Sequence, residues 1–371
     1  MQLLRKILFP FSLIYALVVY LRNFLFDVGI FKSKSFSTPI VCIGNLSVGG
    51  TGKTPMIEFL IDVLQNDKKI AVLSRGYGRK SDGFLLANKD VIVENLGDEP
   101  YQIHQKFPNV TVAVDADRRN GISILEKEIK PDLILLDDAF QHRKVKAEFN
   151  ILLTAYSSLY ASDWYLPTGN LRDAKNQSKR ADIIVVTKCL VTISDAEQNK
   201  IIQKLKPKTN QKVLFAYLSY ANELIGESDT INLDVITNKS IALVTGIANP
   251  DPLCKYLSTK DIAFEHLKYG DHHFFTEKQL ALFNSKEIVL TTEKDYVRLK
   301  NEVVCNYIAI KHVFIDEVIK SKNKGLLFIN NFIKTDLSVE SFLLRQQLVN
   351  FIFYMRLYCF FCFYTCYTNV T

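Results

Sequence analysis

The sequence lacks any dense block of lysine and arginine, although 46 basic residues against 39 acidic ones leave a formal net charge of +7. Nucleic-acid binding relies on such blocks, so no nucleic-acid partner is predicted. The modest positive charge is compatible with an anionic ligand or a negatively charged membrane surface. With 48% hydrophobic and 23% charged residues, the 371-residue chain has the composition of a folded protein and is long enough for two domains.

The body of the chain also lacks cysteine pairs with the spacing of metal ligands. The seven cysteines are odd in number, which fits a reduced, cytosolic compartment best. Cys359 and Cys362 are separated by two residues, but no second pair and no nearby histidine accompanies them, so we predict no metal site there. Repeats of solenoid period are absent as well.

The apolar run near the N-terminus, residues 7–21, is shorter than the roughly 20 residues that a membrane-spanning helix needs. Lys6 precedes the run, Arg22 follows it, and no small-residue cleavage site comes after it. A signal peptide is the alternative interpretation. We expect residues 1–30 to form a retained, membrane-associated helix, inserted or lying at the interface, with Lys6 and Arg22 reaching lipid headgroups.

The composition changes abruptly after Asp336, and residues 349–367 are rich in aromatic side chains and cysteine. A second membrane segment is one interpretation, but no functional pattern accompanies the change. We leave residues 336–371 as an unassigned apolar tail.

Short β-branched runs alternate with helical patterns along the chain. The first series has apolar runs at 40–43, 70–73, 110–114, 133–136, 151–153 and 183–187, with helical patterns at 56–64, 100–107 and 120–128. The second has strand patterns at 213–217, 241–245, 288–292 and 303–308, and helical patterns at 252–257 and 277–283. Near-continuous apolar strands predict an α/β fold, a P-loop NTPase-type parallel sheet covered by helices on both faces. We expect a nucleotide-binding domain at 31–221, a linker at 222–239 and a smaller α/β domain at 240–335.

A glycine-rich loop follows the first apolar run and leads into a helical pattern. Glycines let backbone N–H groups face a polyphosphate, and the helix that follows presents its positive end to the same oxygens. The order strand, loop, Gly-Lys-Thr, helix predicts a phosphate-binding P-loop for a nucleoside triphosphate, with a hydroxyl residue where the usual pattern has glycine. The residues of this loop are Ser47, Val48, Gly49, Gly50, Thr51, Gly52, Lys53 and Thr54. In this interpretation Lys53 reaches the β- and γ-phosphates and Thr54 binds Mg²⁺.

Two adjacent carboxylates, Asp137 and Asp138, end the apolar run at 133–136. A strand-end acid beside a P-loop is where Mg²⁺ is held, because a hard cation prefers oxygen ligands. Neighbouring side chains on an extended strand point in opposite directions, so we expect one carboxylate near the metal and the other bonded to the adjacent loop. A solvated strand end is the alternative.

Further polar motifs follow other strands. Their candidate anion-binding residues are Arg75, Arg79, Arg118, Arg119, Arg172 and Asp173. Ligands collect at the carboxyl ends of a parallel sheet, whereas surface salt bridges are the alternative for each of these residues. Asp98 comes just before a helical pattern, where the residues alone favour a helix N-cap. His272 belongs to the only pair of adjacent histidines, and nothing local decides its role.

Taken together, the motifs resemble those of the tetraacyldisaccharide 4'-kinase family, from residue 1 to about 335. The matching pieces, besides the N-terminal apolar helix, are IGNLSVGGTGKTP at 43–55, SRGYGR at 74–79, GDEP at 97–100, DADR at 115–118, LDDAFQH at 136–142, LPTGNLRD at 166–173, TGIANP at 245–250, GDHHFF at 270–275 and TTEKDYVRL at 291–299. The family itself carries a hydroxyl residue at the position of Ser47. It often has glutamate where this chain has Asp173, and glycine where this chain has Ala139.

The resemblance implies transfer of the γ-phosphoryl group of ATP to the 4'-hydroxyl of a tetraacylated glucosamine disaccharide 1-phosphate, a lipid A precursor, at the cytoplasmic face of the bacterial inner membrane. It implies that Lys53 binds phosphate and that Thr54 binds Mg²⁺. It also implies that Asp137 and Asp138 complete the ligand shell of the metal. It makes Asp98 the base toward the sugar hydroxyl, instead of a cap, with His272 as its partner.

The alternative is a P-loop GTPase or metallochaperone-like switch protein. Such proteins recognise guanine with the motif Asn/Thr-Lys-x-Asp after a strand. In this chain the corresponding residues, 187–190, are Thr-Lys-Cys-Leu. Leucine at the fourth position disfavours this alternative.

Overall fold

The computed structural model describes residues 5, 7–227, 229–236, 239–271 and 273–315. His272 and the predicted tail at 336–371 lie outside the described residues. The described residues belong to one compact unit, residues 1–319.

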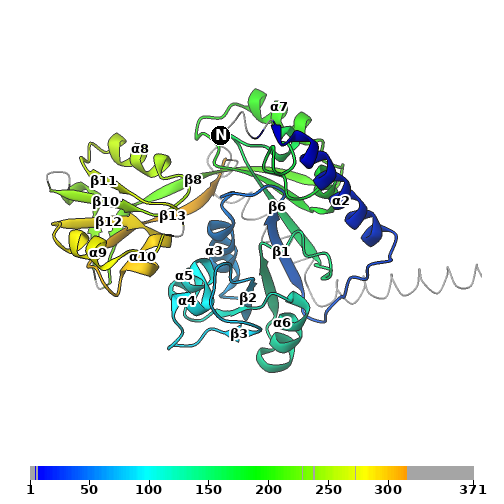
Figure 1. The fold of residues 1–371 in the computed structure, drawn as a ribbon, viewed down its shortest axis with the longest axis horizontal. Coiled ribbons are helices and arrows are strands. Elements are labelled where there is room, and N and C mark those ends of the chain that lie inside the picture. The colour runs from blue at the N-terminus through cyan, green and yellow to red at the C-terminus, as the bar shows by residue number, and fades with distance from the viewer. Residues whose placement is uncertain (1–4, 6, 228, 237–238, 272, 316–371) are drawn as a thin grey trace, which may run out of the picture. The chain divides into compact units, whose positions relative to one another are not determined.

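Parallel strands form the sheet of the first series, as the sequence predicts (Figure 1). Its central strand is β1, which pairs in parallel with β5 on one side and with β6 on the other. The parallel strands are β1 (Ile40–Asn45), β2 (Ile70–Ser74), β4 (Thr111–Val114), β5 (Leu133–Asp137), β6 (Phe149–Ala155) and β7 (Ile183–Thr187). Nearly all of their residues are buried, because helices cover both faces of a sheet of this kind. A short strand, β3 (Leu85–Leu86), pairs antiparallel with β4.

Helices connect these strands and bury their apolar sides against the sheet. They are α3 (Lys53–Leu64), α4 (Val93–Leu96), α5 (Asp98–Lys106), α6 (Arg118–Ile124), which continues as a π-helix (Leu125–Ile129), and α7 (Asp195–Leu205). In α3 the residues Met56, Ile57, Leu60, Ile61 and Leu64 are fully buried. Their spacing of three and four residues gives the helix one apolar face, which contacts β1 and β5. The residues just before α3 are thereby fixed at the end of the central strand.

One long strand, β8 (Lys212–Ile225), belongs to both series. Its first residues pair in parallel with β7, and its later residues pair antiparallel with β13 (Asn306–Phe314). The segment predicted as a linker, 222–239, therefore begins inside β8 and continues through β9 (Thr230–Asn232) and a 3-10 turn (Leu233–Val235). The domain boundaries stay a prediction.

The second series completes the sheet with β10 (Ile241–Thr245), β11 (Glu265–Lys268) and β12 (Ile288–Thr292), which are parallel to one another. Helices α8 (Asp251–Thr259) and α9 (Glu277–Asn284) connect these strands in turn, and α10 (Glu293–Leu299) connects β12 to β13. Leu243, Leu253, Leu257 and Leu290 belong to a hydrophobic cluster that is distinct from the one around β1.

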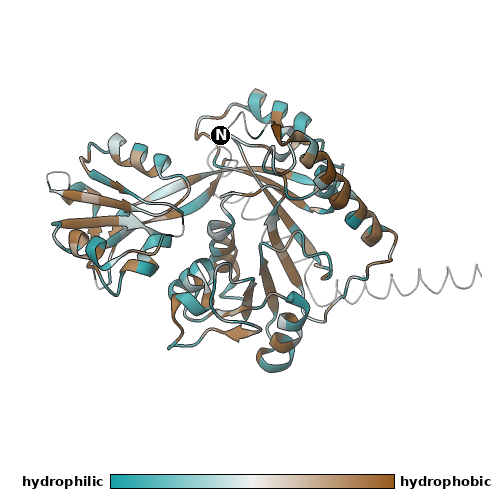
Figure 2. Cartoon of the chain, viewed as in Figure 1, coloured by the Kyte–Doolittle hydropathy of each residue, from teal (hydrophilic) through white to brown (hydrophobic). Residues whose placement is uncertain are grey.

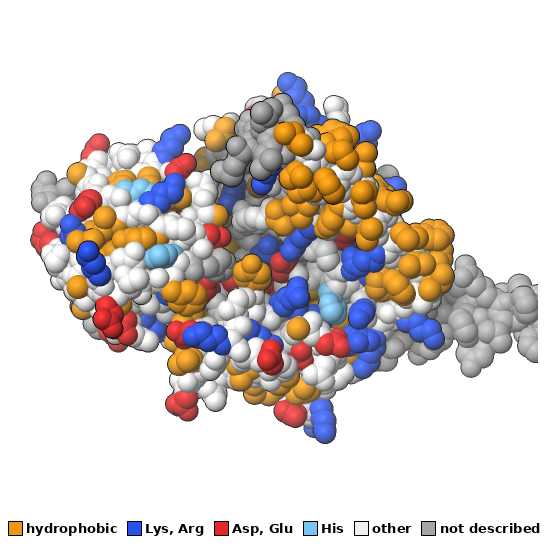
Figure 3. Space-filling view, viewed as in Figure 1, with side chains coloured by type: hydrophobic (Ala, Val, Ile, Leu, Met, Phe, Trp, Pro, Cys, Tyr) orange, Lys and Arg blue, Asp and Glu red, His pale blue; other side chains and the backbone are white. Residues whose placement is uncertain are grey.

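Helix α2 (Phe9–Asp27) forms at the predicted N-terminal apolar run and is longer than that run. Within the described residues, it alone is long and apolar enough to cross a membrane. Its buried residues are Ser12, Val19 and Asn23, whereas large apolar side chains such as Leu17 are exposed. Figure 2 shows the hydrophobic character along α2, and Figure 3 shows hydrophobic side chains gathered over it. The polarity is the reverse of that of a helix on a soluble protein.

Candidate active site

The P-loop lies between the end of β1 and the start of α3, where the sequence predicts it. Gly49 and Gly52 have φ angles of 106° and 82°, in the left-handed region that glycine adopts without strain. The side-chain amide of Asn45 donates to Thr51 Oγ1 at 2.8 Å, and the Thr187 hydroxyl donates to the Thr51 carbonyl at 2.8 Å. Bonds from two strand ends therefore fix the shape of the loop.

The helix that follows the P-loop begins at Lys53, and no side chain caps its N-terminus. Its first N–H groups thus face the site where an anion is favoured by the helix dipole. His312, on β13, lies 2.9 Å from the Gly52 carbonyl through Nε2. Burial lowers the pKa of His312 to about 4, so the ring is neutral and Nε2–H is the donor. The sequence offers no local signal for His312, which is 260 residues from its partner.

The two strand-end acids have different surroundings. Asp137 ends β5 and accepts a hydrogen bond from Ser74 Oγ at 2.9 Å, while its Oδ1 is buried without a hydrogen-bond partner among the described residues. Asp138 follows with a φ of 47°. Lys53 Nζ lies 3.7 Å from Asp138 Oδ1, and Arg172 Nη1 donates to Asp138 Oδ2 at 3.0 Å. Asp138 therefore bonds the adjacent loop, and Asp137 keeps an unused acceptor.

The pKa values of the two acids shift in opposite directions. Burial, and then the charge of Asp138, raise the pKa of Asp137 to about 6. Burial opposes ionisation of Asp138 too, but Lys53 and Arg172 together outweigh it and lower the pKa of Asp138. Cationic side chains thus keep Asp138 ionised at neutral pH, as a site for a cation and phosphates requires.

The loop at 166–173 lies against the P-loop. The Arg172 amide donates to the Leu46 carbonyl at 2.9 Å, and the Val48 amide donates to the Asn170 carbonyl at 2.8 Å. Ser47 forms an antiparallel bridge with Leu171. Arg172 Nη2 also bonds Asn45 Oδ1, and Asp173 is completely buried. Arg172 therefore lies at the P-loop, whereas the next residue, Asp173, is buried in the protein interior.

The other predicted arginines differ in their surroundings. Arg118 is buried and donates to the carbonyls of Asp115 at 2.7 Å and Asp137 at 3.3 Å, so it supports the loop that carries the acids. Arg119 pairs with Asp117 at 2.8 Å near the surface. Arg79 donates to the carbonyl of Gly83, within its own loop. Arg75 is exposed directly after β2. Their roles toward a substrate stay predictions.

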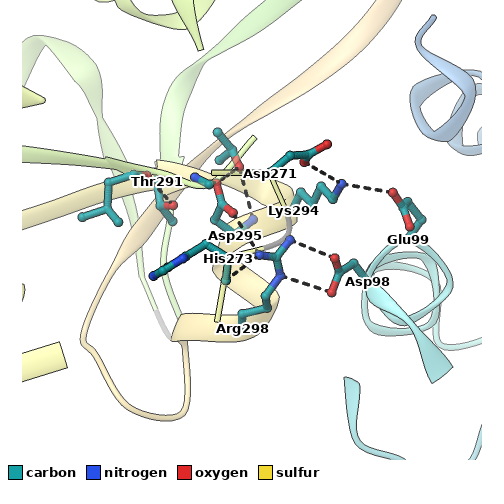
Figure 4. A network of polar contacts seen from close by, with 11 residues as sticks. Asp98, Glu99, Asp271, His273, Thr291, Lys294, Asp295 and Arg298 are labelled. Carbon is teal, nitrogen blue, oxygen red and sulfur yellow. Dashed lines mark hydrogen bonds and ion pairs between the residues drawn. The ribbon is translucent and has the colours of Figure 1, made fainter. Parts of the chain in front are cut away.

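Asp98 begins α5, and Gly97, with a φ of 92°, is the N-cap residue. The cap interpretation of Asp98 is therefore wrong. Both oxygens of Asp98 accept hydrogen bonds from Arg298 of α10, at 3.1 Å from Nε and at 2.8 Å from Nη2 (Figure 4). Arg298 Nη1 also donates to the His273 carbonyl at 2.9 Å. Arg298 thereby bridges the Asp98 carboxylate and the backbone of His273, the residue that follows His272 in the sequence.

A second ion-pair cluster in Figure 4 joins the same segments. Lys294 Nζ lies 3.2 Å from Glu99 Oε1 and 3.4 Å from Asp271 Oδ1. Lys294 and Arg298 are four residues apart and so lie on one face of α10. Both belong to the TTEKDYVRL motif, to which the sequence interpretation gives no role. Their spacing of four residues is a signal that could have indicated a shared basic face.

A family model described as tetraacyldisaccharide-1-P 4'-kinase matches residues 4–324. The chain is 51% identical over 323 residues to a tetraacyldisaccharide 4'-kinase from Flavobacterium johnsoniae, covering 85% of this chain and 94% of that protein. It is 43% identical over 316 residues to one from Bacteroides thetaiotaomicron, covering 80% and 83%.

A crystal structure of LpxK from Aquifex aeolicus in complex with ATP is similar as well, with a TM-score of 0.72 and 30% sequence identity. The match covers 88% of this chain and 99% of that chain. Because the family model matches most of the chain, and the two relatives are matched over 94% and 83% of their own lengths, the chain belongs to the tetraacyldisaccharide-1-P 4'-kinase family.

Proposed function

We propose that the site transfers the γ-phosphoryl group of ATP to the 4'-hydroxyl of a tetraacylated glucosamine disaccharide 1-phosphate, in lipid A biosynthesis. Family membership supports the enzyme class, and the ATP-bound relative supports the donor. The observation that carries the proposal is the meeting of Lys53, Asp138 and Arg172 at the uncapped start of α3. Phosphoryl transfer depends on such positioning and charge neutralisation.

The P-loop binds the polyphosphate of ATP in this proposal. The backbone of residues 47–52 and the free N–H groups at the start of α3 face its oxygens. Lys53 turns from Asp138 toward the β- and γ-phosphates, and Arg172 stabilises the charge that develops on the transferred group. Arg172 is already held by the Asp138 carboxylate, whereas Lys53 leaves that carboxylate when it turns to the phosphates.

The residues present also fit Mg²⁺. Asp137 Oδ1 is a buried oxygen without a hydrogen-bond partner among the described residues, which suits a cation ligand. No cluster of three or more His, Cys, Asp or Glu side chains forms in the described part of the chain, and Mg²⁺ needs none, since phosphates and water complete its shell. Thr54, Asp137 and Asp138 would hold the ion, which neutralises phosphate charge when bound.

Asp98 accepts the proton of the sugar hydroxyl in this proposal, with His272 as its partner. Arg298 fixes the Asp98 carboxylate through two hydrogen bonds and keeps it from rotating. The contact of Arg298 with the His273 carbonyl links this base to the segment that carries His272. The arrangement supports a base supplied from α5 and oriented by α10.

Helix α2 attaches the enzyme to the membrane that contains its lipid substrate. Its exposed apolar side chains support this role, and they gather on one face of the molecule (Figure 3). We place the enzyme at the cytoplasmic face of the inner membrane, where ATP is present.

The test measures ATP consumption with and without the lipid disaccharide, together with transfer of labelled phosphate to the lipid. We expect turnover that requires both the lipid and ATP. GTP turnover without lipid would overturn the proposal and support a switch protein instead.

A further inference from the structure

The buried side of α2 is a stripe of mostly polar residues, with Val19 as its apolar member. Ser12, Tyr15, Val19 and Asn23 follow one another at intervals of three and four residues, so they lie on one face of the helix. Ser12 and Asn23 are each only 2% exposed. Attachment to a membrane by the outer face requires no buried polar groups on the inner one, so this stripe calls for another explanation.

The stripe contacts the loop at 166–173 along much of its length. Ser12 Oγ donates to Thr168 Oγ1 at 2.7 Å and accepts from the Thr168 amide at 3.0 Å. Tyr15 OH donates to the carbonyl of Arg172 at 3.0 Å. The backbone on which Arg172 stands is therefore bonded to α2.

Asn23 makes the most buried of these contacts. Its Nδ2 donates to Asp173 Oδ1 at 2.7 Å, and Asp173 is 0% exposed. The same oxygen accepts the Ala174 amide at 2.8 Å. The Asn23 carbonyl in turn accepts from Arg143 Nη1 at 2.9 Å. Both bonds end on Oδ1, and Asp173 Oδ2 is buried without a hydrogen-bond partner among the described residues, so Asn23 supplies the only side-chain donor to this carboxylate there.

Asp173 adjoins Arg172 in the chain, and the Arg172 guanidinium reaches Asp138 and Asn45 at the phosphate site. A change in the position of Asp173 therefore moves the peptide that carries Arg172. Small displacements of a charged group in such a site have large effects on rate.

We propose that Asn23 is a positioning residue for phosphoryl transfer, which acts through Asp173 to set Arg172 against Asp138. The inference deepens the proposed function and depends on it. The membrane-seeking helix is then part of the architecture of the active site.

The first test compares Asn23→Asp and Asn23→Ala with wild type, in detergent micelles that contain the lipid acceptor. Asn23→Asp places a second carboxylate beside Asp173, and Asn23→Ala removes the amide without adding charge. We expect kcat to fall about tenfold or more for Asn23→Asp, and several-fold for Asn23→Ala, at temperatures well below unfolding. Values of kcat within twofold of wild type in both variants would overturn the proposal.

The matched control is Asp27→Asn, one turn further along α2. It removes the exposed ion pair with Arg143, at 2.7 Å, by the same kind of side-chain exchange. We expect its kcat to stay within twofold of wild type. Exchange of the pair, Asn23→Asp with Asp173→Asn, restores a donor and an acceptor, and we expect it to recover most of the kcat lost in Asn23→Asp.

A double-mutant cycle separates positioning from general stabilisation. If Asn23 acts through Arg172, Asn23→Ala changes kcat by less than twofold once Arg172→Met is present. Equal effects of Asn23→Ala in both backgrounds would contradict the proposal. The wild-type assay comes first, and failure of lipid-dependent ATP turnover there would count against the proposed function. With normal wild-type turnover, independent effects of Asn23→Ala and Arg172→Met on kcat would count against the role of Asn23 alone.

Discussion

At the residue scale, the central feature is the balance of charge at the P-loop. Lys53 and Arg172 both face Asp138, while Asp137 has an acceptor that no described group uses. The cationic side chains are therefore already positioned at the P-loop before the substrate binds. Such preorganisation is what makes electrostatic stabilisation effective in phosphoryl transfer.

Replacing Lys53 by alanine removes a positive charge from the transferred phosphate. We expect Lys53→Ala to lower kcat/KM by roughly a thousandfold, because one fixed cation in such a site contributes several powers of ten to rate. The measurement is transfer of labelled phosphate to the lipid. Lys89→Ala, an exposed loop substitution, is the control and should behave as wild type. Normal turnover of Lys53→Ala would defeat the assignment of the P-loop.

Asp98→Ala tests the proposed base. We expect turnover to fall about a hundredfold or more, as for other general bases, while the affinity for ATP changes little. Initial rates and nucleotide binding, measured separately, distinguish the two effects. An unchanged rate would leave Asp98 with only a structural role in its ion pair with Arg298.

The sequence predicted the residues that lie next to one another in the chain. The P-loop and the pair Asp137 and Asp138 follow strands directly, so local spacing is enough to locate them. Arg298 is 200 residues from Asp98 and His312 is 260 residues from Gly52. Contacts of that range depend on how helices and strands pack, and a single sequence contains no local pattern for them.

At the element scale, α2 has its apolar side chains outside and its polar side chains inside. Leu17 is 69% exposed and Phe24 is 57% exposed, so both are available to a lipid surface. Burial of a large apolar side chain contributes about 1.5–3 kcal/mol, and a few such side chains therefore suffice for attachment.

Replacing Leu17 and Phe24 together by asparagine should lower binding to anionic phospholipid vesicles by at least about tenfold. The measurement is co-sedimentation with vesicles at fixed ionic strength. Val304→Asn is the control, since Val304 is 92% exposed but lies in the irregular segment just before β13. Unchanged binding of the double variant would remove α2 from the membrane contact.

The extent of most strands of the first series was predicted to within about two residues, because fully buried parallel strands are continuous apolar runs. β8 was predicted too short, and the run predicted at 303–308 begins three residues before β13 and ends six residues before the end of that strand. Many of their residues are only partly buried, and polar residues such as Asn222 and Lys311 interrupt the apolar stretches, so an apolar run marks only part of each strand. Helices α7 and α10 were not predicted, because most of their residues are polar and neither contains a long apolar run.

At the scale of the whole molecule, a largely buried cluster of ion pairs connects α3, the helix after the P-loop, with α10 through α5. Lys106 of α5 lies 2.8 Å from Glu58 of α3 and 2.7 Å from Glu293 of α10. Gln102 also donates to Glu58 at 2.8 Å. Burial, and then the charge of Glu293, raise the pKa of Glu58 to about 7. Burial opposes protonation of Lys106, but the two carboxylates together raise the pKa of Lys106.

Lys106→Met should destabilise the protein in a pH-dependent way. Because the pKa of Glu58 is raised in the folded state, its ionisation lowers stability as the pH rises through about 7. Without Lys106 two buried carboxylates lose their cation, so we expect a loss of about 3 kcal/mol at pH 8 that shrinks toward pH 5 as both become protonated. Denaturant unfolding at the two pH values measures this.

The control for this prediction is Lys300→Met, which removes a bond to the uncharged Gln105 side chain. We expect it to cost less than about 1 kcal/mol and to show little pH dependence. A loss for Lys106→Met that is equal at both pH values would show that its packing matters more than its charge.

The reversed polarity of α2 bears on how a soluble form of this enzyme is to be engineered. Its outer side chains make few contacts with the protein, so polar substitutions there leave the fold intact. Removing the whole helix is different, because it would expose the carboxylate of Asp173 and free the loop that carries Arg172. A soluble form is therefore better obtained by polar substitutions on the exposed face of α2 than by deletion of the helix.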